Sequence, residues 1–89
     1  MKKEAQIFKA LSDETRVKII VMLSKGSLCA CKILEAFDIT QPTLSYHMKI
    51  LCTTGLVNCE KKGLWNYYSL NDETVLVISD YIKLIRRTA

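Results

Sequence analysis

The start of a helix near residue 40 constrains the fold of this chain more than any other feature of its sequence. Thr40 is a favourable N-cap, and Pro42 falls in the first helical turn, where its missing N–H costs no hydrogen bond. An apolar stripe at helical spacing follows, made of Leu44, Met48 and Leu51. Gly55 is a helix stop. The sequence therefore predicts a helix over residues 40–55.

Another helix is predicted directly before this one, over residues 30–37. Its apolar positions have the spacing i, i+3, i+4, i+7 and are occupied by Ala30, Ile33, Leu34 and Phe37. Asp38 and Ile39 leave room only for a tight turn between the two helices. Two helices joined by so short a turn are typical of a helix-turn-helix, whose second helix reads DNA.

A β-hairpin is predicted after the reading helix. Residues 56–60 and 64–70 are rich in strand formers, and they flank a short basic connection made of Lys61, Lys62 and Gly63. A hairpin with a basic tip in this position is the wing of a winged helix. We expect a single domain over residues 1–89, mainly α with a small β-hairpin (α+β), of the winged helix-turn-helix type.

Both ends of the chain are predicted to be helical and to form a dimer interface. Ile7, Phe8 and Leu11 indicate a first helix, and a second helix follows the capping residue Asp13. The last helix ends near Arg87 and carries more apolar side chains than one face can hide: Val75, Leu76, Val77, Ile78, Tyr81, Ile82, Leu84 and Ile85. Because 49% of only 89 residues are hydrophobic, this surplus needs a second surface. We expect a homodimer through the terminal helices, with Ile7 and Phe8 contributing.

The composition indicates a cytoplasmic protein that can bind nucleic acid. The formal net charge is +4, which permits contacts with phosphates. No leader pattern follows the charged start, and no apolar run reaches the length of a membrane span. We expect a cytoplasmic location and no membrane contact. In that reducing compartment the four cysteines are expected to be ligands, redox sensors or core residues, and not a disulfide frame.

Polar side chains turn away from the apolar stripe of the reading helix. They belong to Gln41, Thr43, Ser45, Tyr46 and Lys49. Amide, hydroxyl and ammonium groups contact base edges and phosphates in the major groove, so the predicted partner is double-stranded DNA. His47, on the flank of this helix, is expected to contact a phosphate or a base, with packing as the alternative. Lys61 and Lys62 are expected to contact phosphates or the minor groove.

Cys29 and Cys31 stand one residue apart at the predicted start of helix 30–37. Thiolates bind soft metals and metalloids strongly, and a helix N-terminus favours the thiolate form. Residues two apart on a helix point about 200° away from each other, so one small atom would reach both sulfurs only if the segment were extended. Chelation is therefore expected to distort the start of this helix and, through it, the reading helix.

Several segments together resemble the ArsR/SmtB metalloregulators over nearly the whole chain. They are residues 10–19, 28–31, 41–51, 55–57 and 63–70. The resemblance implies a homodimeric winged-helix transcriptional repressor that binds an inverted-repeat operator and leaves it when a metal or metalloid binds.

The resemblance also implies where the inducer binds. The cysteine pair is similar to the first two ligands of the Cys-x-Cys-x-x-Cys site for trivalent arsenic and antimony, with Cys29 and Cys31 as ligands. Leu34 stands at the third ligand position, which leaves Cys52, Cys59 or a small thiol as alternative donors. The family's other site, on the C-terminal helix, uses Asp and His. Residues 71–89 contain no His, so no zinc site is expected there.

Three other functions compete with this one. The same repressor could sense oxidants or persulfide, and because a ring between Cys29 and Cys31 would be small, Cys31 is expected to pair with a distant thiol. A second alternative is a winged helix that binds protein instead of DNA. An enzyme is not expected, because neither cysteine is followed six residues on by the Arg of a phosphatase or arsenate reductase loop.

Overall fold

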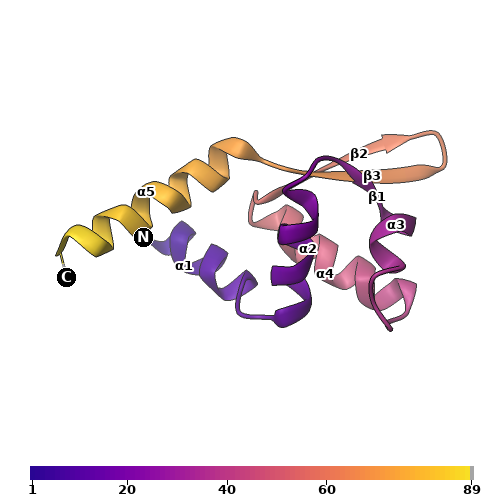
Figure 1. Cartoon of the computed structure of the whole chain (residues 1–89), viewed down its shortest axis with the longest axis horizontal. Coiled ribbons are helices and arrows are strands. Elements are labelled where there is room, and N and C mark those ends of the chain that lie inside the picture. The colour runs from indigo at the N-terminus through magenta and orange to yellow at the C-terminus, as the bar shows by residue number, and fades with distance from the viewer. Residues whose placement is uncertain (89) are drawn as a thin grey trace.

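The computed structural model describes residues 1–88 as five helices around a small antiparallel sheet (Figure 1). Along the chain the elements are α1 (Lys2–Ala10), α2 (Glu14–Leu23), β1 (Leu28–Cys29), α3 (Ala30–Leu34), α4 (Gln41–Thr53), β2 (Val57–Lys62), β3 (Trp65–Leu70) and α5 (Asp72–Thr88). The strand order is β1-β3-β2, so the first strand adds to the hairpin on its β3 edge. This is the winged helix-turn-helix architecture that the sequence predicts.

Side-chain caps fix where the central helices begin. Asp13 caps α2, because its carboxylate accepts a hydrogen bond from the N–H of Arg16 at 3.1 Å. Thr40 caps α4 by accepting from the N–H of Thr43 at 3.3 Å, and Pro42 lies in the first turn of that helix. The predicted reading helix is therefore confirmed, with its N-terminus where the capping signal places it.

The core lies between α2, α3, α4 and the sheet. Its largest fully buried side chains come from four helices and are Ile7, Ile19, Leu23, Ile33, Met48 and Leu51. Tyr68 of β3 and Ile78 of α5 are also buried in this core. Each of the three predicted stripe residues of the reading helix is buried, so α4 has one fixed face toward the core and one free face.

Two predicted boundaries are wrong in detail. The helix expected over residues 30–37 ends at Leu34. Directly before this helix lies a two-residue strand, in which Leu28 pairs with Tyr68. The hairpin connection is also shorter than expected: Lys61 and Lys62 belong to β2, and Lys62 pairs with Trp65, which leaves Gly63 and Leu64 as the turn. Gly63 has φ +63°, the left-handed conformation that such a turn requires. We call β2, β3 and this turn the wing.

The terminal helices lie side by side at the end of the molecule opposite the wing tip (Figure 1). The rings of Phe8 and Tyr81 are 5.9 Å apart. Ile7 was expected to contribute to a dimer interface, but it is fully buried in the core of the monomer. That expectation is wrong for Ile7, because α1 turns this residue inward, while Phe8 stays partly exposed. Within residues 1–88, no helix is long and apolar enough to cross a membrane.

Candidate nucleic-acid interface and cysteine pair

The residues predicted to read DNA keep their polar groups on the free side of α4. Gln41, Thr43, Ser45, Tyr46 and Lys49 are all exposed. The Thr43 hydroxyl accepts a hydrogen bond from the Thr40 hydroxyl at 3.0 Å. Gln41 and Ser45 line a cavity described below, and the Tyr46 ring lies 5.6 Å from that of His47. The structure thus exposes these five predicted side chains on one helix.

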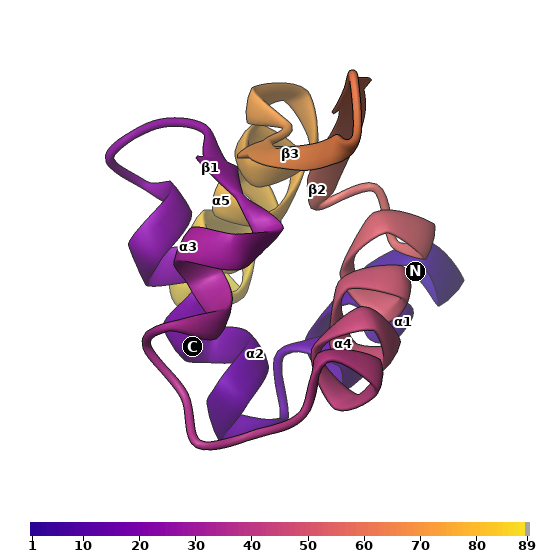
Figure 2. The same ribbon diagram turned by 90° about the vertical axis from the view of Figure 1, so that its right-hand side faces the viewer.

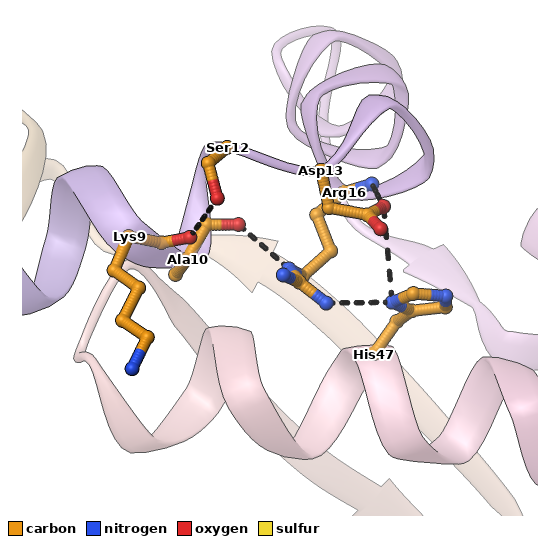
Figure 3. A network of polar contacts seen from close by, with 6 residues as sticks. All are labelled: Lys9, Ala10, Ser12, Asp13, Arg16 and His47. Atoms are coloured by element: carbon orange, nitrogen blue, oxygen red, sulfur yellow. Dashed lines mark hydrogen bonds and ion pairs between the residues drawn. The ribbon is translucent and has the colours of Figure 1, made fainter.

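His47 makes a contact that the sequence did not predict. Its side chain is largely buried, with 11% of its surface exposed, and its ring faces the corner between α1 and α2 (Figure 3). Arg16 donates from Nη1 to the His47 Nδ1 at 3.0 Å and from Nε to the Ala10 carbonyl at 2.6 Å. Because a guanidinium can only donate, Nδ1 is the acceptor and the neutral ring carries its proton on Nε2. Arg16 therefore ties the reading helix to the end of α1.

Asp13 completes this polar network (Figure 3). Its Oδ1 lies 4.0 Å from the His47 Nδ1, in addition to capping α2. The hydrogen bond from the Arg16 N–H is the main cause that holds the pKa of Asp13 below its ordinary value, and the charge of Arg16 adds to it. The sequence marked Asp13 as a cap. Its contact with residue 47 could not be found there, because nothing local links the two positions.

The two wing lysines lie on opposite faces of β2. Side chains alternate along a strand, and the register pairs Lys61 with Asn66 and Lys62 with Trp65. Lys62 lies over the ring of Tyr67 at 5.3 Å and pairs with Glu60 at 3.8 Å. The side chain of Lys61 lies on the same face of the sheet as that of Cys59, which pairs with the buried Tyr68. Of the two lysines, only Lys61 therefore lies on the sheet face that packs on the core.

Cys29 and Cys31 lie where β1 ends and α3 begins. Cys29 has an extended backbone with φ −75° and ψ 155°, and its Sγ caps α3 by accepting from the Lys32 N–H at 3.3 Å. The two sulfurs are joined as a disulfide, with the Cα atoms 5.4 Å apart. The expectation that they diverge is wrong, because Cys29 belongs to the strand and not to the helix. The expectation that Cys31 pairs only with a distant thiol is wrong for the same reason.

A cavity of about 230 Å³ opens beside Cys31, between α3, α4 and the wing. We call it the wing cavity. Its apolar lining includes Leu34, Leu44, Met48 and Trp65. Figure 2 looks toward this end of the molecule, with α3 on the left, α4 on the right and β1 beside β3. Polar side chains of Gln41, Ser45 and Asn66 line the wing cavity as well. Leu34, which stands at the predicted third ligand position, therefore lines a small cavity of mixed polarity next to Cys31.

The other two cysteines, Cys52 of α4 and Cys59 of β2, lie near the buried Tyr68. Cys59 is the cross-strand partner of Tyr68, and burial followed by the nearby Cys59 and Cys52 raises the pKa of Tyr68 to about 12. Burial, and then Cys59, raises the pKa of the Cys52 thiol. Within residues 1–88, no three His, Cys, Asp or Glu side chains form a group that could hold a metal ion.

Comparison with known proteins places this geometry in a family. Residues 13–58 match the profile described as bacterial regulatory protein, arsR family. The chain is 47% identical to the arsenical resistance operon repressor of Bacillus subtilis (strain 168) over 76 residues. The aligned residues cover 84% of this chain and 72% of that protein. The chain belongs to the ArsR family.

Solved structures agree on the fold of this ArsR-family chain. The crystal structure of the ArsR family transcriptional regulator RHA00566 superposes with a TM-score of 0.90 at 22% identity, over 98% of this chain and 90% of that one. The homodimeric winged helix-turn-helix DNA-binding domain Mb0332 of Mycobacterium bovis superposes with a TM-score of 0.78 at 22% identity, over 97% and 80%. The protein is a winged helix-turn-helix transcriptional repressor of the ArsR family.

The family match covers the cysteine pair and the reading helix but not most of the wing. It includes Asp13, Arg16, the cysteine pair and all of α4, and it ends within β2. Sequence reasoning found the cysteine pair and the reading helix, but it missed Arg16 and the strand β1. The only local sign of β1 is a pair of residues before a capped helix, which is too short for any periodicity.

Proposed function

We propose that this ArsR-family protein is a homodimeric repressor that binds an inverted-repeat operator and is released by trivalent arsenic or antimony on Cys29 and Cys31. The observation that carries the proposal is the meeting of the two sulfurs at the start of α3, directly before the reading helix. Likeness to an arsenical resistance repressor supports the choice of inducer. We propose no catalytic step, and we place the protein in the cytoplasm, where operator DNA lies.

The proposed DNA contacts come from α4 and the wing. The polar free side of α4 enters the major groove, with base and phosphate contacts from Gln41, Thr43, Ser45, Tyr46 and Lys49. Lys61, on the wing face that packs toward the core, is the next proposed contact. Lys62 forms an ion pair with Glu60, and this pair breaks when Lys62 contacts a phosphate. For His47, we favour a role in positioning α4, because Arg16 already occupies its Nδ1.

The proposed dimer joins the terminal helices of two copies. Leu76, Val77 and Ile82 of α5 are exposed apolar side chains. Phe8 of α1 contacts the same helix through Tyr81 and has 38% of its surface exposed. Apolar patches of this kind on a small protein are covered by a partner. A twofold dimer presents two reading helices to successive major grooves, about 34–36 Å apart, which matches an inverted repeat.

The proposed release acts through the wing and the α3 cap. Cys29 pairs with Tyr67 in the β1–β3 ladder, and its sulfur caps α3. An arsenic atom that takes a lone pair from this sulfur competes with the cap, and it shifts a strand that is hydrogen-bonded to the wing. No unwinding of α3 is needed, which replaces the distortion expected from the sequence. The DNA-competent arrangement then loses population.

A DNA-release assay tests the proposal. Reduced protein is bound to labelled DNA from upstream of its own gene, and arsenite or antimonite is added while fluorescence anisotropy is followed. We expect release of the parent protein and no release of the Cys29→Ser/Cys31→Ser variant, with Cys52→Ser/Cys59→Ser as the matched control that is still released. Equal release of the parent and the Cys29→Ser/Cys31→Ser variant would show that the pair is not the sensor. Binding with no salt dependence would favour a protein-interaction module.

A second candidate signal is oxidation, and the disulfide between Cys29 and Cys31 favours it. Two thiols give up two electrons and two protons to a peroxide or persulfide and form the S–S bond. In this case oxidised protein binds DNA more weakly than reduced protein, without any metalloid. Mass spectrometry after mild peroxide, run beside the anisotropy assay, tests whether formation of this disulfide coincides with release.

A further inference from the structure

One guanidinium connects three helices at the corner shown in Figure 3. Arg16 of α2 donates from Nε to the carbonyl of Ala10, the last residue of α1, at 2.6 Å. It donates from Nη1 to the Nδ1 of His47, in the middle of the reading helix α4, at 3.0 Å. Within residues 1–88, no other side-chain hydrogen bond links α1 to α4. The polar connection between these two helices is therefore made by Arg16.

The two acceptors are groups that need a partner. The last four carbonyls of a helix have none within the helix, and the Ala10 carbonyl is one of them. The charge of Arg16 also lies at the negative end of the α1 dipole. The side chain of His47 is largely buried, so little water can replace Arg16 at its Nδ1. Both hydrogen bonds are therefore expected to persist in solution.

The shape of the guanidinium makes this connection directional. Its N–H groups form a rigid planar fork, so the two bonds fix the acceptors on α1 and α4 relative to each other. Ile7 of α1 and Met48 of α4 share the core, but apolar packing is non-directional. On the outer side, Gln6 of α1 and Lys49 of α4 border an open hollow of about 460 Å³. The angle between the two helices thus depends on Arg16.

The first of these helices belongs to the proposed dimer interface. The ring of Phe8 lies 5.9 Å from that of Tyr81 in α5, and the Tyr81 hydroxyl donates to the Sδ of Met1 at 3.4 Å. These contacts hold α1 to α5, while Arg16 holds the other end of α1 to α4. In a twofold dimer the same angle occurs in both copies, so it determines how far apart the two reading helices lie.

We propose that Arg16 is a positioning residue that determines which spacing between two operator half-sites the dimer accepts. This inference rests on the proposed function, since it requires a homodimer on an inverted repeat. One added base pair moves a half-site by about 3.4 Å along the DNA and about 34° around it. A dimer with a fixed angle between α1 and α4 cannot follow this change. A dimer that lacks the Arg16 contacts can rotate its reading helices to do so.

Operators of different length test the proposal. Footprinting of reduced protein on DNA from upstream of its own gene locates the half-sites, and duplexes are then made with a centre longer or shorter by one base pair. Fluorescence anisotropy measures each affinity. We expect the parent to bind the altered duplexes about tenfold more weakly, and Arg16→Lys about threefold or less. Lysine keeps the charge beside Ala10, but it cannot form both hydrogen bonds in the planar geometry of arginine.

Three further variants separate positioning from a general loss of stability. His47→Ala removes the acceptor on α4 and should relax the spacing preference as Arg16→Lys does. His47→Asn should keep the preference, because its side-chain oxygen can accept in place of Nδ1. Lys18→Ala is the matched control, since it removes a different side-chain hydrogen bond of α2, to the Ala36 carbonyl, and it should behave as the parent does. Arg16→Lys should also keep the parent's dependence of affinity on salt, because no phosphate contact is lost.

Two results would overturn the inference and leave the proposed function standing. In the first, Arg16→Lys and His47→Ala discriminate between spacings as sharply as the parent does. In the second, the parent accepts all spacings equally. A parent that sediments as a monomer, or that protects a single half-site, would contradict the proposed homodimer and the inference with it. If circular dichroism shows that Arg16→Lys does not fold, the comparison of His47→Ala with His47→Asn decides the outcome.

Discussion

At the residue scale, Asp13 both caps α2 and lies beside the Arg16–His47 contact. Its pKa is lowered, so its contribution to stability is fully present above the ordinary carboxyl pKa of about 3.9 and declines as the pH falls below that value. Asp13→Ala should lower the free energy of unfolding by about 1 kcal/mol at pH 7, and by less at pH 3. Urea unfolding at the two pH values measures this, with Glu14→Ala as the control on the same turn. A loss that is equal at both pH values would contradict the assignment.

His47 offers a choice between positioning and DNA contact that can be measured. A phosphate contact adds about one unit to the slope of log affinity against log salt, whereas a positioning residue does not. We expect His47→Ala to lower the free energy of unfolding by about 1 kcal/mol, because the Arg16 donor loses its acceptor, and to leave the salt slope unchanged. Lys49→Ala should do the opposite, reducing the slope with little change in stability. A reduced slope for His47→Ala would restore the DNA contact predicted from the sequence.

At the scale of the element, the stability of the wing depends on the turn that contains Gly63. Gly63 has φ +63°, and no atom lies within 4 Å of the place a Cβ would take, so a substitution there is penalised by backbone conformation alone. Gly63→Ala should destabilise the hairpin by about 1 kcal/mol, and Gly63→Asn by less, because Asn tolerates this conformation. Cleavage by trypsin after Lys61 and Lys62 measures local opening of the wing. Equal cleavage of the two variants would show that the turn does not limit the wing.

How far the sequence predicts each element depends on whether its cause is local. The reading helix was predictable, because Thr40, Pro42 and the buried stripe all lie within one segment. The strand β1 was not, since two residues become a strand only by pairing with β3, some forty residues later. The position of Cys29 in that strand decides the geometry of the cysteine pair. The cysteine pair was therefore readable from the sequence, while the direction of its side chains was not.

The shape of the whole molecule separates its two proposed surfaces. The principal extents are 46 × 24 × 22 Å, with the terminal helices at one end of the long axis and the wing tip at the other (Figure 1). The cysteine pair lies in the half that carries the wing, since β1 pairs with β3. Under the proposed function, an inducer there acts directly on the DNA-binding elements within one subunit. The proposed release therefore does not require the proposed dimer to dissociate.

The proposed dimer can accordingly be tested apart from the proposed sensor site. Ile82 of α5 is half exposed, and a charge at this position opposes burial in an interface. Ile82→Asp should convert the dimer to a monomer in analytical ultracentrifugation and weaken operator binding by at least about tenfold, because one reading helix alone covers one half-site. Leu64→Asp is the matched control: it charges an apolar side chain that is 92% exposed at the wing tip, and it should leave the protein dimeric. If Ile82→Asp sediments as the parent does, the interface lies on another face, and the exposed Val17 and Val21 of α2 are the next place to introduce a charge.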